Sequence, residues 1–186
     1  IEEAKKYALD ILAEEFSEDA DLKGQLRGIV VRTAEIKTTG DQENTPYEMY
    51  YDHKEPALRM PSHRTLAINR GEKEGILKVT ISVDEVRALQ TMTARYITKN
   101  PDCNTLLKEA SEDSFKRLIL PSLERELRNT LTERAEDSSI VVFKENLKSL
   151  LLQPPVKGYS VMGFDPGFRT GCKVAVLDET GKYLDH

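Results

Sequence analysis

One short run of residues near the carboxyl end of the chain has the types and spacing needed for metal or phosphate chemistry. It covers residues 163–178 and reads GFDPGFRTGCKVAVLD. A strand that ends at Asp165 would present this carboxylate at the start of a tight turn, because Pro166 and Gly167 follow directly. Gly171 permits close backbone approach, and the next strand then runs back antiparallel. Hard divalent cations such as Mg²⁺ prefer carboxylate oxygen, so Asp165 is a candidate metal ligand.

The same turn allows two interpretations that need no metal. The favoured one is that Asp165 accepts hydrogen bonds from the backbone amides of the bend. Two-metal phosphoryl transfer needs several converging carboxylates, and this run supplies only the first. The hairpin also resembles the phosphate-binding turn of actin-like kinases, with Thr170 near the phosphate, although the proline after the aspartate argues against this. Arg169 and Lys173 flank the turn and could bind a phosphate by charge.

A second group of basic residues surrounds a short predicted helix. Its members are Arg59, His63, Arg64, Arg70 and Lys73. Arg64 and Arg70 are the candidates for contact with a nucleic-acid backbone. The favoured alternative is a solvated helix face whose charges pair with Glu72 and Glu74. No Cys, His or acidic residue stands at ligand spacing around His63, so a structural histidine is expected there.

Bulk composition indicates a helical protein with local rather than global affinity for nucleic acid. Of the 186 residues, 39% are hydrophobic and 32% are charged, and the formal net charge is −5. Net acidity does not suit a protein that coats nucleic acid over its whole surface, so any such contact must be local. No apolar run approaches the roughly 20 residues that a membrane helix needs, and no signal peptide is recognisable.

Two further features bear on the setting of the protein. The first residue is Ile1 rather than Met, from which we expect the chain to begin inside a longer protein. Cys103 and Cys172 are far apart and belong to no CxxC motif, which predicts two free thiols and neither a zinc site nor a disulfide. A reducing cytoplasm is therefore the expected location.

Apolar periodicity predicts helices over most of residues 1–150. The residues expected to face inward are Ala8, Ile11, Leu12, Phe16, Leu22, Leu26, Ile29, Val30, Val86, Leu89, Ile97, Leu107, Ala110, Leu118, Leu123, Leu127, Leu131, Ile140, Phe143, Leu147, Leu150 and Leu151. Ser17 and Asp84 are the expected N-caps of two of these helices. A short helix should open at Ser62 and close at Gly71.

Other segments between these helices are predicted to be strand or loop. The alternation from Ile76 to Val83 predicts a strand. Residues 38–46 are polar, contain a glycine and a proline, and predict an exposed loop. Tyr47, Tyr50 and Tyr51 follow it and are expected to dock it onto the core, with stacking on bases as the alternative.

Prolines mark two further boundaries in the chain. Pro121 should start or kink a helix, because proline lacks a backbone donor. On the helix beyond it, Glu124 and Arg128 have the i, i+4 spacing of an exposed ion pair. Pro154 and Pro155 end the last helix, and a change of composition places a domain boundary near residue 157.

The region after this boundary is predicted to be β-structure. Residues 159–164 and 172–177 predict the two strands of a hairpin, and a third strand begins before His186. The expected fold is therefore mainly α: a helical bundle-like module with a small β element in residues 1–157, then a terminal β-hairpin in residues 158–186. Two strands are not stable alone, so we expect the hairpin to pack on the helical part or to pair with a neighbouring chain.

These motifs resemble a known family. The run from residue 163 resembles the first hairpin of RuvC- and YqgF-type ribonuclease-H-like domains, in which an Asp in a G-x-D-P-G turn is the first metal ligand. Its longer form, GFDPGFRTGCKVAVLDETGKYLD, resembles the Tex family of bacterial transcription-accessory proteins more closely. Four further stretches resemble the same family, namely ALDILAEEFSEDADLKGQLR (8–27), PSHRTLAINRGEKEGILKV (61–79), LPSLERELR (120–128) and AEDSSIVVFKENLKSLLLQPP (135–155). The resemblance spans essentially the whole chain.

The resemblance implies that a helical region is followed by the opening of a ribonuclease-H-like α/β domain. The family also carries helix-hairpin-helix elements and a C-terminal OB-fold RNA-binding domain, which this chain does not include. It is associated with transcription, binds nucleic acid and is similar to a eukaryotic transcription elongation factor. Asp165 matches the family's turn aspartate. Nuclease activity does not follow, because such a site needs further acidic residues from later strands and a helix.

The leading hypothesis is a nucleic-acid-binding and scaffolding segment without catalysis of its own. Its expected contacts are Arg64, Arg70, Arg169 and Lys173, and its expected partners are RNA or DNA and the transcription machinery, with no membrane. No cofactor is expected for this chain, and Mg²⁺ would bind at Asp165 only in a full-length parent. The alternatives are part of a metal-dependent ribonuclease-H-like nuclease and a helical protein–protein interaction module.

Overall fold

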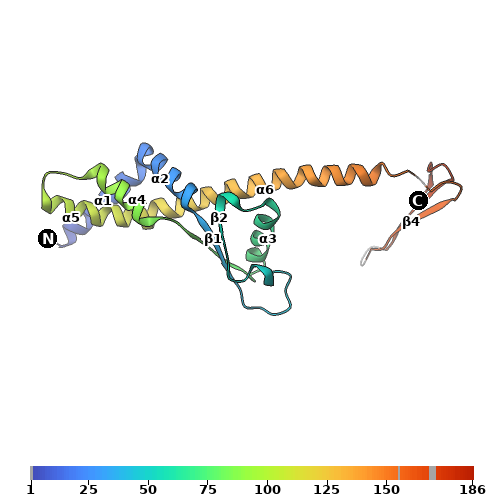
Figure 1. Cartoon of the computed structure of the whole chain (residues 1–186), viewed down its shortest axis with the longest axis horizontal. Helices are drawn as coiled ribbons and strands as arrows, with labels where there is room; N and C mark the ends of the chain where they lie inside the picture. Colours follow the sequence, from blue (N-terminus) through green and yellow to red (C-terminus); the bar gives the residue numbers. More distant parts are fainter. Residues whose placement is uncertain (1, 155, 168–170) are drawn as a thin grey trace. The chain divides into compact units, whose positions relative to one another are not determined.

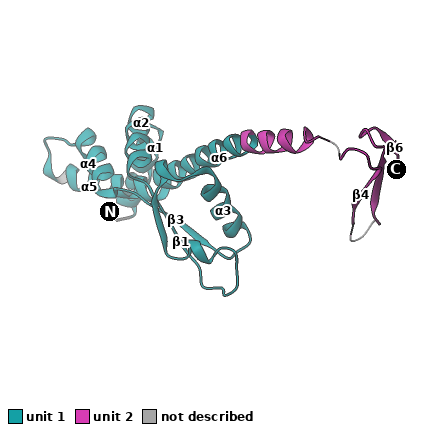
Figure 2. Ribbon diagram, turned by 45° about the vertical axis from the view of Figure 1, so that its right-hand side comes forward, with its two compact units in different colours: residues 1–140 teal, residues 141–186 magenta. Residues whose placement is uncertain are grey.

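The structure of the chain is a computed structural model that describes residues 2–154, 156–167 and 171–186. The chain divides into two compact units, residues 1–140 and residues 141–186, drawn in teal and magenta in Figure 2. This division lies within the last helix. The domain boundary expected near residue 157 stays a prediction.

The first unit consists mainly of helices, with one small sheet that lies beside α3 (Figure 1). In chain order its elements are α1 (Glu2–Glu18), α2 (Ala20–Thr33), β1 (Glu35–Thr39), η1 (Glu48–Tyr50), β2 (His53–Pro56), η2 (Ala57–Arg59), α3 (Ser62–Lys73), β3 (Lys78–Ser82), α4 (Glu85–Tyr96), α5 (Pro101–Asp113), the π-helical segment η3 (Ser114–Ile119) and α6 (Leu120–Leu151). The second unit holds the end of α6 and the strands β4 (Val161–Asp165), β5 (Lys173–Leu177) and β6 (Tyr183–Asp185). The mainly α fold class with a terminal β region is confirmed.

The sheet of the first unit has the antiparallel order β2-β1-β3. Its central strand β1 includes Thr38, which we had expected to lie in a loop. The polar composition of this segment misled the prediction, because Thr38 is 1% exposed and its hydroxyl donates to the backbone oxygen of Tyr50. The loop begins at Gly40 instead. Its docking by tyrosines is confirmed, since Tyr47 is buried and the Tyr51 hydroxyl donates to the Gln42 backbone oxygen at 2.7 Å.

Side-chain caps set the starts of α2 and α4. Asp84 caps α4 as expected, accepting from the Arg87 backbone N–H at 3.0 Å. The cap of α2 is Asp19 and not Ser17, because Ser17 stays within α1 and its hydroxyl donates to the Glu14 backbone oxygen. A carboxylate is a strong acceptor for the free N–H groups at a helix start, and Asp19 accepts from Leu22 N at 2.9 Å.

Two expectations about individual helices are wrong. Helix α3 continues past Gly71 to Lys73, and the turn after it uses Gly75, whose φ is 74°. Gly71 is instead a packing residue, because an added Cβ there would lie 2.7 Å from a Leu77 methyl carbon. On α4 the inward residues are Ala88 and Met92, whereas the expected Val86 and Ile97 are 66% and 64% exposed. Helix α4 packs against α2 and α5, and Leu89, the third residue expected to face inward, is partly buried against the core.

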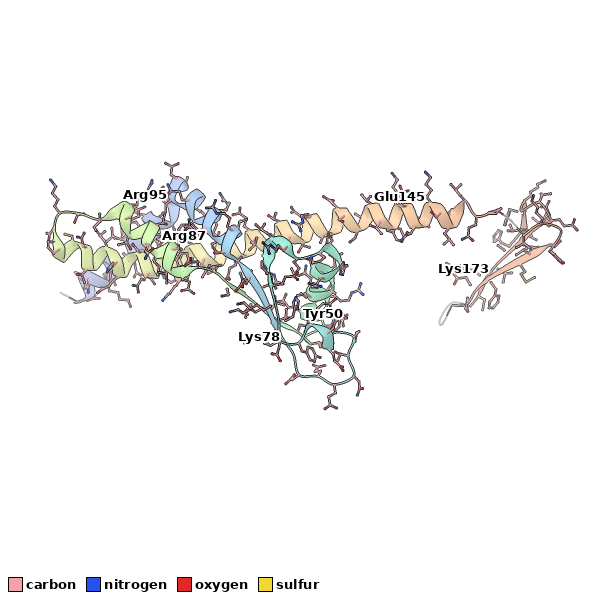
Figure 3. All side chains as sticks on the ribbon, in the orientation of Figure 1. Tyr50, Lys78, Arg87, Arg95, Glu145 and Lys173 are labelled. Carbon is pink, nitrogen blue, oxygen red and sulfur yellow. The ribbon has the colours of Figure 1, made fainter. Side chains whose placement is uncertain are left out.

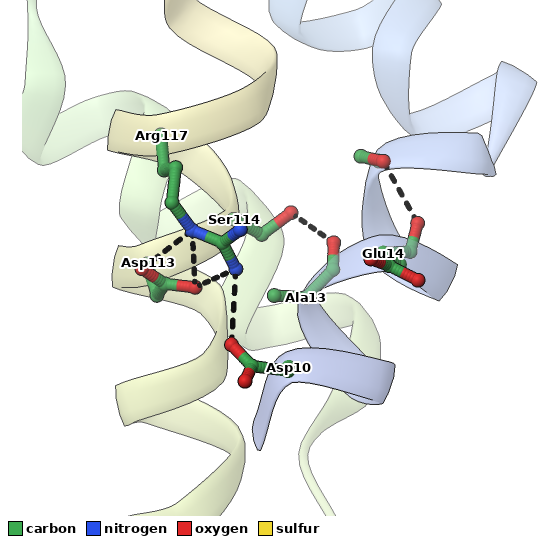
Figure 4. A network of polar contacts seen from close by, with 7 residues as sticks. Asp10, Ala13, Glu14, Asp113, Ser114 and Arg117 are labelled. Carbon is green, nitrogen blue, oxygen red and sulfur yellow. Dashed lines mark hydrogen bonds and ion pairs between the residues drawn. The ribbon is translucent and has the colours of Figure 1, made fainter. Parts of the chain in front are cut away.

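Helix α5 passes into α6 through the π-helical segment η3, just before Pro121. Figure 4 shows Ser114 and Arg117 of η3 beside Asp10 and Ala13 of α1. A proline ring clashes with the carbonyl of the preceding turn, and the wider π turn provides room for it. The expectation that Pro121 starts or kinks a helix is confirmed. In the same segment Ser114 donates to the Ala13 backbone oxygen at 2.7 Å, and Arg117 binds Asp113 and Asp10, which ties η3 to α1.

The core of the first unit takes residues from all of the helices α1 to α6 and from β1. The predicted leucine stripe of α6 is confirmed, because Leu123, Leu127 and Leu131 are all buried. Glu124 and Arg128 attract each other by charge as expected, but both are half-buried rather than exposed and no described hydrogen bond joins them. Arg128 instead binds the carboxylate of Glu72 on α3 through both terminal nitrogens, one of them at 2.9 Å. Tertiary packing brings a better-placed carboxylate to this guanidinium than its own helix does.

The second unit has no such core, since none of its described residues is buried. Its three strands form an antiparallel sheet of order β4-β5-β6. The apolar residues expected to face inward at the end of α6 are exposed, and they comprise Ile140, Phe143, Leu147, Leu150 and Leu151. The expectation that this β region packs on the helical part or pairs with another chain stays a prediction. Among the described residues, no helix is long and apolar enough to cross a membrane.

Candidate nucleic-acid interface

The predicted turn of the second unit is a β-hairpin with a single carboxylate near its end. Asp165 is the last residue of β4 and pairs in register with Lys173, the first residue of β5. Residues paired in this way point to the same face of a sheet, so the two side chains are neighbours. Both are exposed, and no ion pair joins them. Arg169 and Thr170 lie outside the described residues.

The turn between β5 and β6 contains a carboxylate, that of Asp178, which accepts several hydrogen bonds and was not predicted from the sequence. Asp178 Oδ1 accepts from the Thr180 N–H at 2.8 Å, the Thr180 hydroxyl at 2.6 Å and the Lys182 N–H at 3.0 Å. These hydrogen bonds, led by that of the Thr180 side chain, lower the pKa of Asp178. The signal was the sequence Asp-Glu-Thr-Gly, in which Asp bonds its own backbone and Gly181 takes a positive φ of 83°. Asp178 therefore shapes the turn between β5 and β6.

A metal centre would need more ligands than the hairpin supplies. Among the described residues, no group of three or more His, Cys, Asp or Glu side chains is placed to hold a metal ion. Cys103 and Cys172 are both free and exposed. The arrangement around Asp165 combines one carboxylate with one ammonium group, which suits a turn or a phosphate contact better than a pair of cations.

The basic group of the first unit lies mainly on α3. Arg64 donates to Glu55 Oε2 on β2, and His53 Nε2 lies 3.3 Å from the same oxygen. Burial raises the pKa of Glu55, but the hydrogen bonds with Arg64 and His53 outweigh it, so its pKa lies below the usual value. Arg64 therefore ties α3 to the sheet. This partner was not among the glutamates expected from the sequence.

The remaining basic side chains of this group point into solvent. Arg70 and Lys73 are exposed in the last turn of α3, His63 is exposed in its first turn, and Arg59 is exposed in η2. Glu72, one of their expected partners, is held by Arg128. Arg64 and Arg70 thus share a helix but differ in freedom: one is fixed in an ion pair and the other is available to a ligand. Neither is placed relative to Lys173, which belongs to the other unit.

The fold and the candidate site together define a class of protein: a helical module with a small sheet, followed by strands that open a ribonuclease-H-like domain. Two family models match the chain. The Tex central region-like model matches residues 2–143, and the Tex protein YqgF-like domain model matches residues 159–186. The chain therefore belongs to the Tex family.

Curated relatives match almost the whole chain. It is 39% identical to the transcriptional accessory protein Tex of Neisseria gonorrhoeae over 97% of its length, and 45% identical to the uncharacterized protein YdcI of Bacillus subtilis over 98%. It is 32% identical to the human S1 RNA-binding domain-containing protein 1 over 94%. The matched part is 26% of each bacterial protein and 19% of the human one, so the chain spans about a quarter or less of these relatives.

Proposed function

We propose that this chain is a nucleic-acid-binding and scaffolding segment of a transcription accessory protein, without catalysis of its own. One observation supports this more than any other. The turn carboxylate Asp165, the residue most able to do metal chemistry, has a lysine as its cross-strand neighbour and no described cluster of acidic groups around it. Hydrolysis by two metal ions needs several carboxylates at one point, whereas a lone Asp beside Lys173 can hold a turn and meet a phosphate.

The relatives support the nucleic-acid part of the proposal. One is named as a transcriptional accessory protein and another as an RNA-binding-domain protein. RNA or DNA and the transcription machinery are the partners that we propose for the full-length protein. Within this chain, Arg70 and Lys173 are exposed cations that could meet phosphates directly. Arg64 could bind a phosphate only by sharing or giving up its hydrogen bond with Glu55. Arg169 is proposed as a phosphate contact on the basis of the sequence alone.

No cofactor is proposed for the chain itself. In the full-length protein Asp165 would supply one oxygen ligand to Mg²⁺, and the remaining ligands would have to come from residues beyond this chain. The nuclease alternative depends entirely on those residues.

A second candidate function is docking of a protein partner. The exposed end of α6 favours it, because Ile140, Phe143 and Leu151 are between 64% and 72% exposed on one helix. A large contiguous patch of exposed apolar side chains often marks a site that binds another protein. In this role the helix would anchor the protein to the transcription machinery, and nucleic acid would not be needed.

Binding and cleavage separate these proposals. The full-length protein would be incubated with labelled RNA and DNA and with Mg²⁺, alongside the Asp165→Asn variant. We expect both proteins to retain the nucleic acid in a salt-sensitive manner without cutting it, because phosphate contacts release counterions. Cleavage that Asp165→Asn abolishes would contradict the proposal in favour of a nuclease. Absence of any binding would favour the protein-docking function.

A further inference from the structure

The small sheet of the first unit has one buried and one solvent-facing side. On the central strand β1, Ile36 and Thr38 are buried at 2% and 1% exposure and face the helices. Because side chains alternate along a strand, Glu35, Lys37 and Thr39 point to the opposite, solvent-facing side. This outward face carries short polar and charged residues from all three strands, namely Glu35, Lys37, Thr39, Lys54, Pro56, Lys78, Thr80 and Ser82.

The register gathers lysines on this face. Lys37 on β1 is directly opposite Lys54 on β2 and Thr80 on β3, and Thr39 in the next row is opposite Lys78. Lys54 is paired with Glu35 at 2.8 Å, whereas no described residue forms an ion pair with Lys37 or Lys78. Figure 3 labels Lys78 on the strand. The face is therefore locally positive in a chain whose net charge is −5.

A groove extends this positive face across the free edge of β3. It has a volume of about 570 Å³ and is lined on one side by the β3 residues Val79, Thr80 and Ile81 and on the other by α6. From α6 it receives Arg125 and Asn129, together with Glu124, Arg128 and Pro121. Arg125 is exposed, and within the described part of the chain it has no ion pair. Thr80 belongs both to the lysine row and to the groove, so the two surfaces meet at this residue.

This arrangement costs stability, which is a reason to look for a ligand. Like charges directly opposite each other destabilise an antiparallel pair, and Lys37 and Lys54 are such a pair. Lysines do protect exposed sheet edges from pairing with other chains, and that role would account for Lys54 and Lys78 on the edge strands. It does not account for Lys37 on the central strand or for Arg125 on a helix.

We propose that the face formed by Lys37, Lys54 and Lys78, with Arg125 in the adjoining groove, binds the sugar–phosphate backbone of a nucleic acid. The proposal rests on the nucleic-acid-binding function above and assigns it a surface that includes none of Arg64, Arg70, Asp165 or Lys173. Ammonium and guanidinium groups attract phosphates without reading bases. The outward residues of the three strands include no aromatic ring for base stacking, so this contact is independent of sequence.

The test compares two triple variants of the whole chain in binding to a labelled oligonucleotide. Lys37→Gln, Lys78→Gln and Arg125→Gln together remove the three unpaired cations of the proposed surface. Lys99→Gln, Lys108→Gln and Lys116→Gln remove three exposed lysines from the region of α5 and η3 as a matched control. The probes are a single-stranded RNA, a single-stranded DNA and a duplex of mixed sequence, each measured between 50 and 200 mM salt, roughly the range over which phosphate contacts show their salt dependence.

We expect the first variant to bind about tenfold or more weakly than the unmodified chain and to lose about 2 from the slope of log affinity against log salt on single strands, roughly 0.7 for each lost phosphate contact. The control should change neither quantity. Unchanged binding by the first variant, or equal weakening by both, would overturn this surface while leaving nucleic-acid binding in place. If the unmodified chain binds none of the probes, the proposed function fails for this chain and the surface fails with it.

Two single substitutions exclude an indirect structural effect. Lys37→Thr should weaken binding while leaving thermal stability equal or higher, because it removes the like-charge pair with Lys54. Glu124→Gln should strengthen binding, because it removes the acidic group of the groove. Weaker binding that merely follows a loss of folding in Lys37→Thr, or no gain in Glu124→Gln, would count against the proposal.

Discussion

The two units of the chain differ in what stabilises them. Every buried hydrophobic residue of the described chain lies at or before Ala135, so the first unit has the whole core. In the second unit the sheet depends on backbone hydrogen bonds, and apolar residues such as Met162 and Phe164 are 66% and 62% exposed. Three strands without a packed face gain little net stability from their ladder. Regular secondary structure can therefore form in a segment that has no packed core to stabilise it as a domain.

The same substitution made in each unit should affect stability very differently. Phe115 is fully buried in η3, and Phe115→Ala should lower the free energy of unfolding by about 3–5 kcal/mol, through lost burial and the cavity that remains. Phe164→Ala on β4 should change it by less than about 0.5 kcal/mol. Urea unfolding followed by circular dichroism measures both. Similar losses would show that the second unit has a core of its own.

The next effect concerns the ion pair that joins α3 to α6. Arg128→Met keeps the apolar stem but leaves Glu72 without its guanidinium, and should cost about 2 kcal/mol, since hydrogen bonds to charged groups contribute about 1.5–3 kcal/mol. Arg125→Met, three residues earlier and exposed, should be close to neutral in the same unfolding experiment. If both variants lose equally, the half-buried pair of Arg128 and Glu72 adds nothing specific to the stability of the first unit.

A smaller, pH-dependent effect is expected at Glu55. Its folded-state pKa is lower than the value of 4.5 in the unfolded chain, so its stabilisation is complete above pH 4.5 and is lost as the pH falls through the folded-state pKa. The Glu55→Gln variant should therefore be less stable by about 1 kcal/mol at neutral pH, and the difference should shrink below pH 4.5. Thermal unfolding at several pH values measures this. A difference that grows on acidification would contradict it.

The smallest effect tests local order in the second unit. Asp178→Ala removes the acceptor for the Thr180 and Lys182 amides, so those amides should exchange faster in hydrogen-exchange experiments while global unfolding stays the same. Glu179→Ala provides the control in the same turn, since the Glu179 side chain is exposed and no described hydrogen bond involves it. Faster exchange throughout the first unit would show that the two units are coupled.

Some features followed from local sequence. Asp84 capped its helix, Pro121 lay where one helix passes into another, and Asp165 ended a strand, because each depends on neighbours within a few residues. The leucine stripe of α6 was also predictable, since a spacing of four residues places side chains on one helix face. Family membership could likewise be recognised from several ordered motifs.

Other features could not be predicted because they depend on which elements meet. Ser17 was the expected cap of α2, but the cap is Asp19, whose carboxylate is also held by Arg95 and Tyr96 of α4, with hydrogen bonds of 2.6 and 2.9 Å. The polar Thr38 became buried because a backbone oxygen 12 residues away satisfied its hydroxyl. Arg128 hydrogen-bonds Glu72 on α3 for the same kind of reason, although Glu124 lies four residues away on its own helix and also attracts it.

The sequence by itself determined the helical character of the chain, its terminal strands and its family, because periodicity, turn residues and motifs are encoded within short stretches. Only the tertiary structure decided which face of α4 is inward, which carboxylate each arginine binds, and that three lysines far apart in the chain meet on one face of a sheet. Pairing register and packing between distant elements fix those outcomes, and no local pattern contains them.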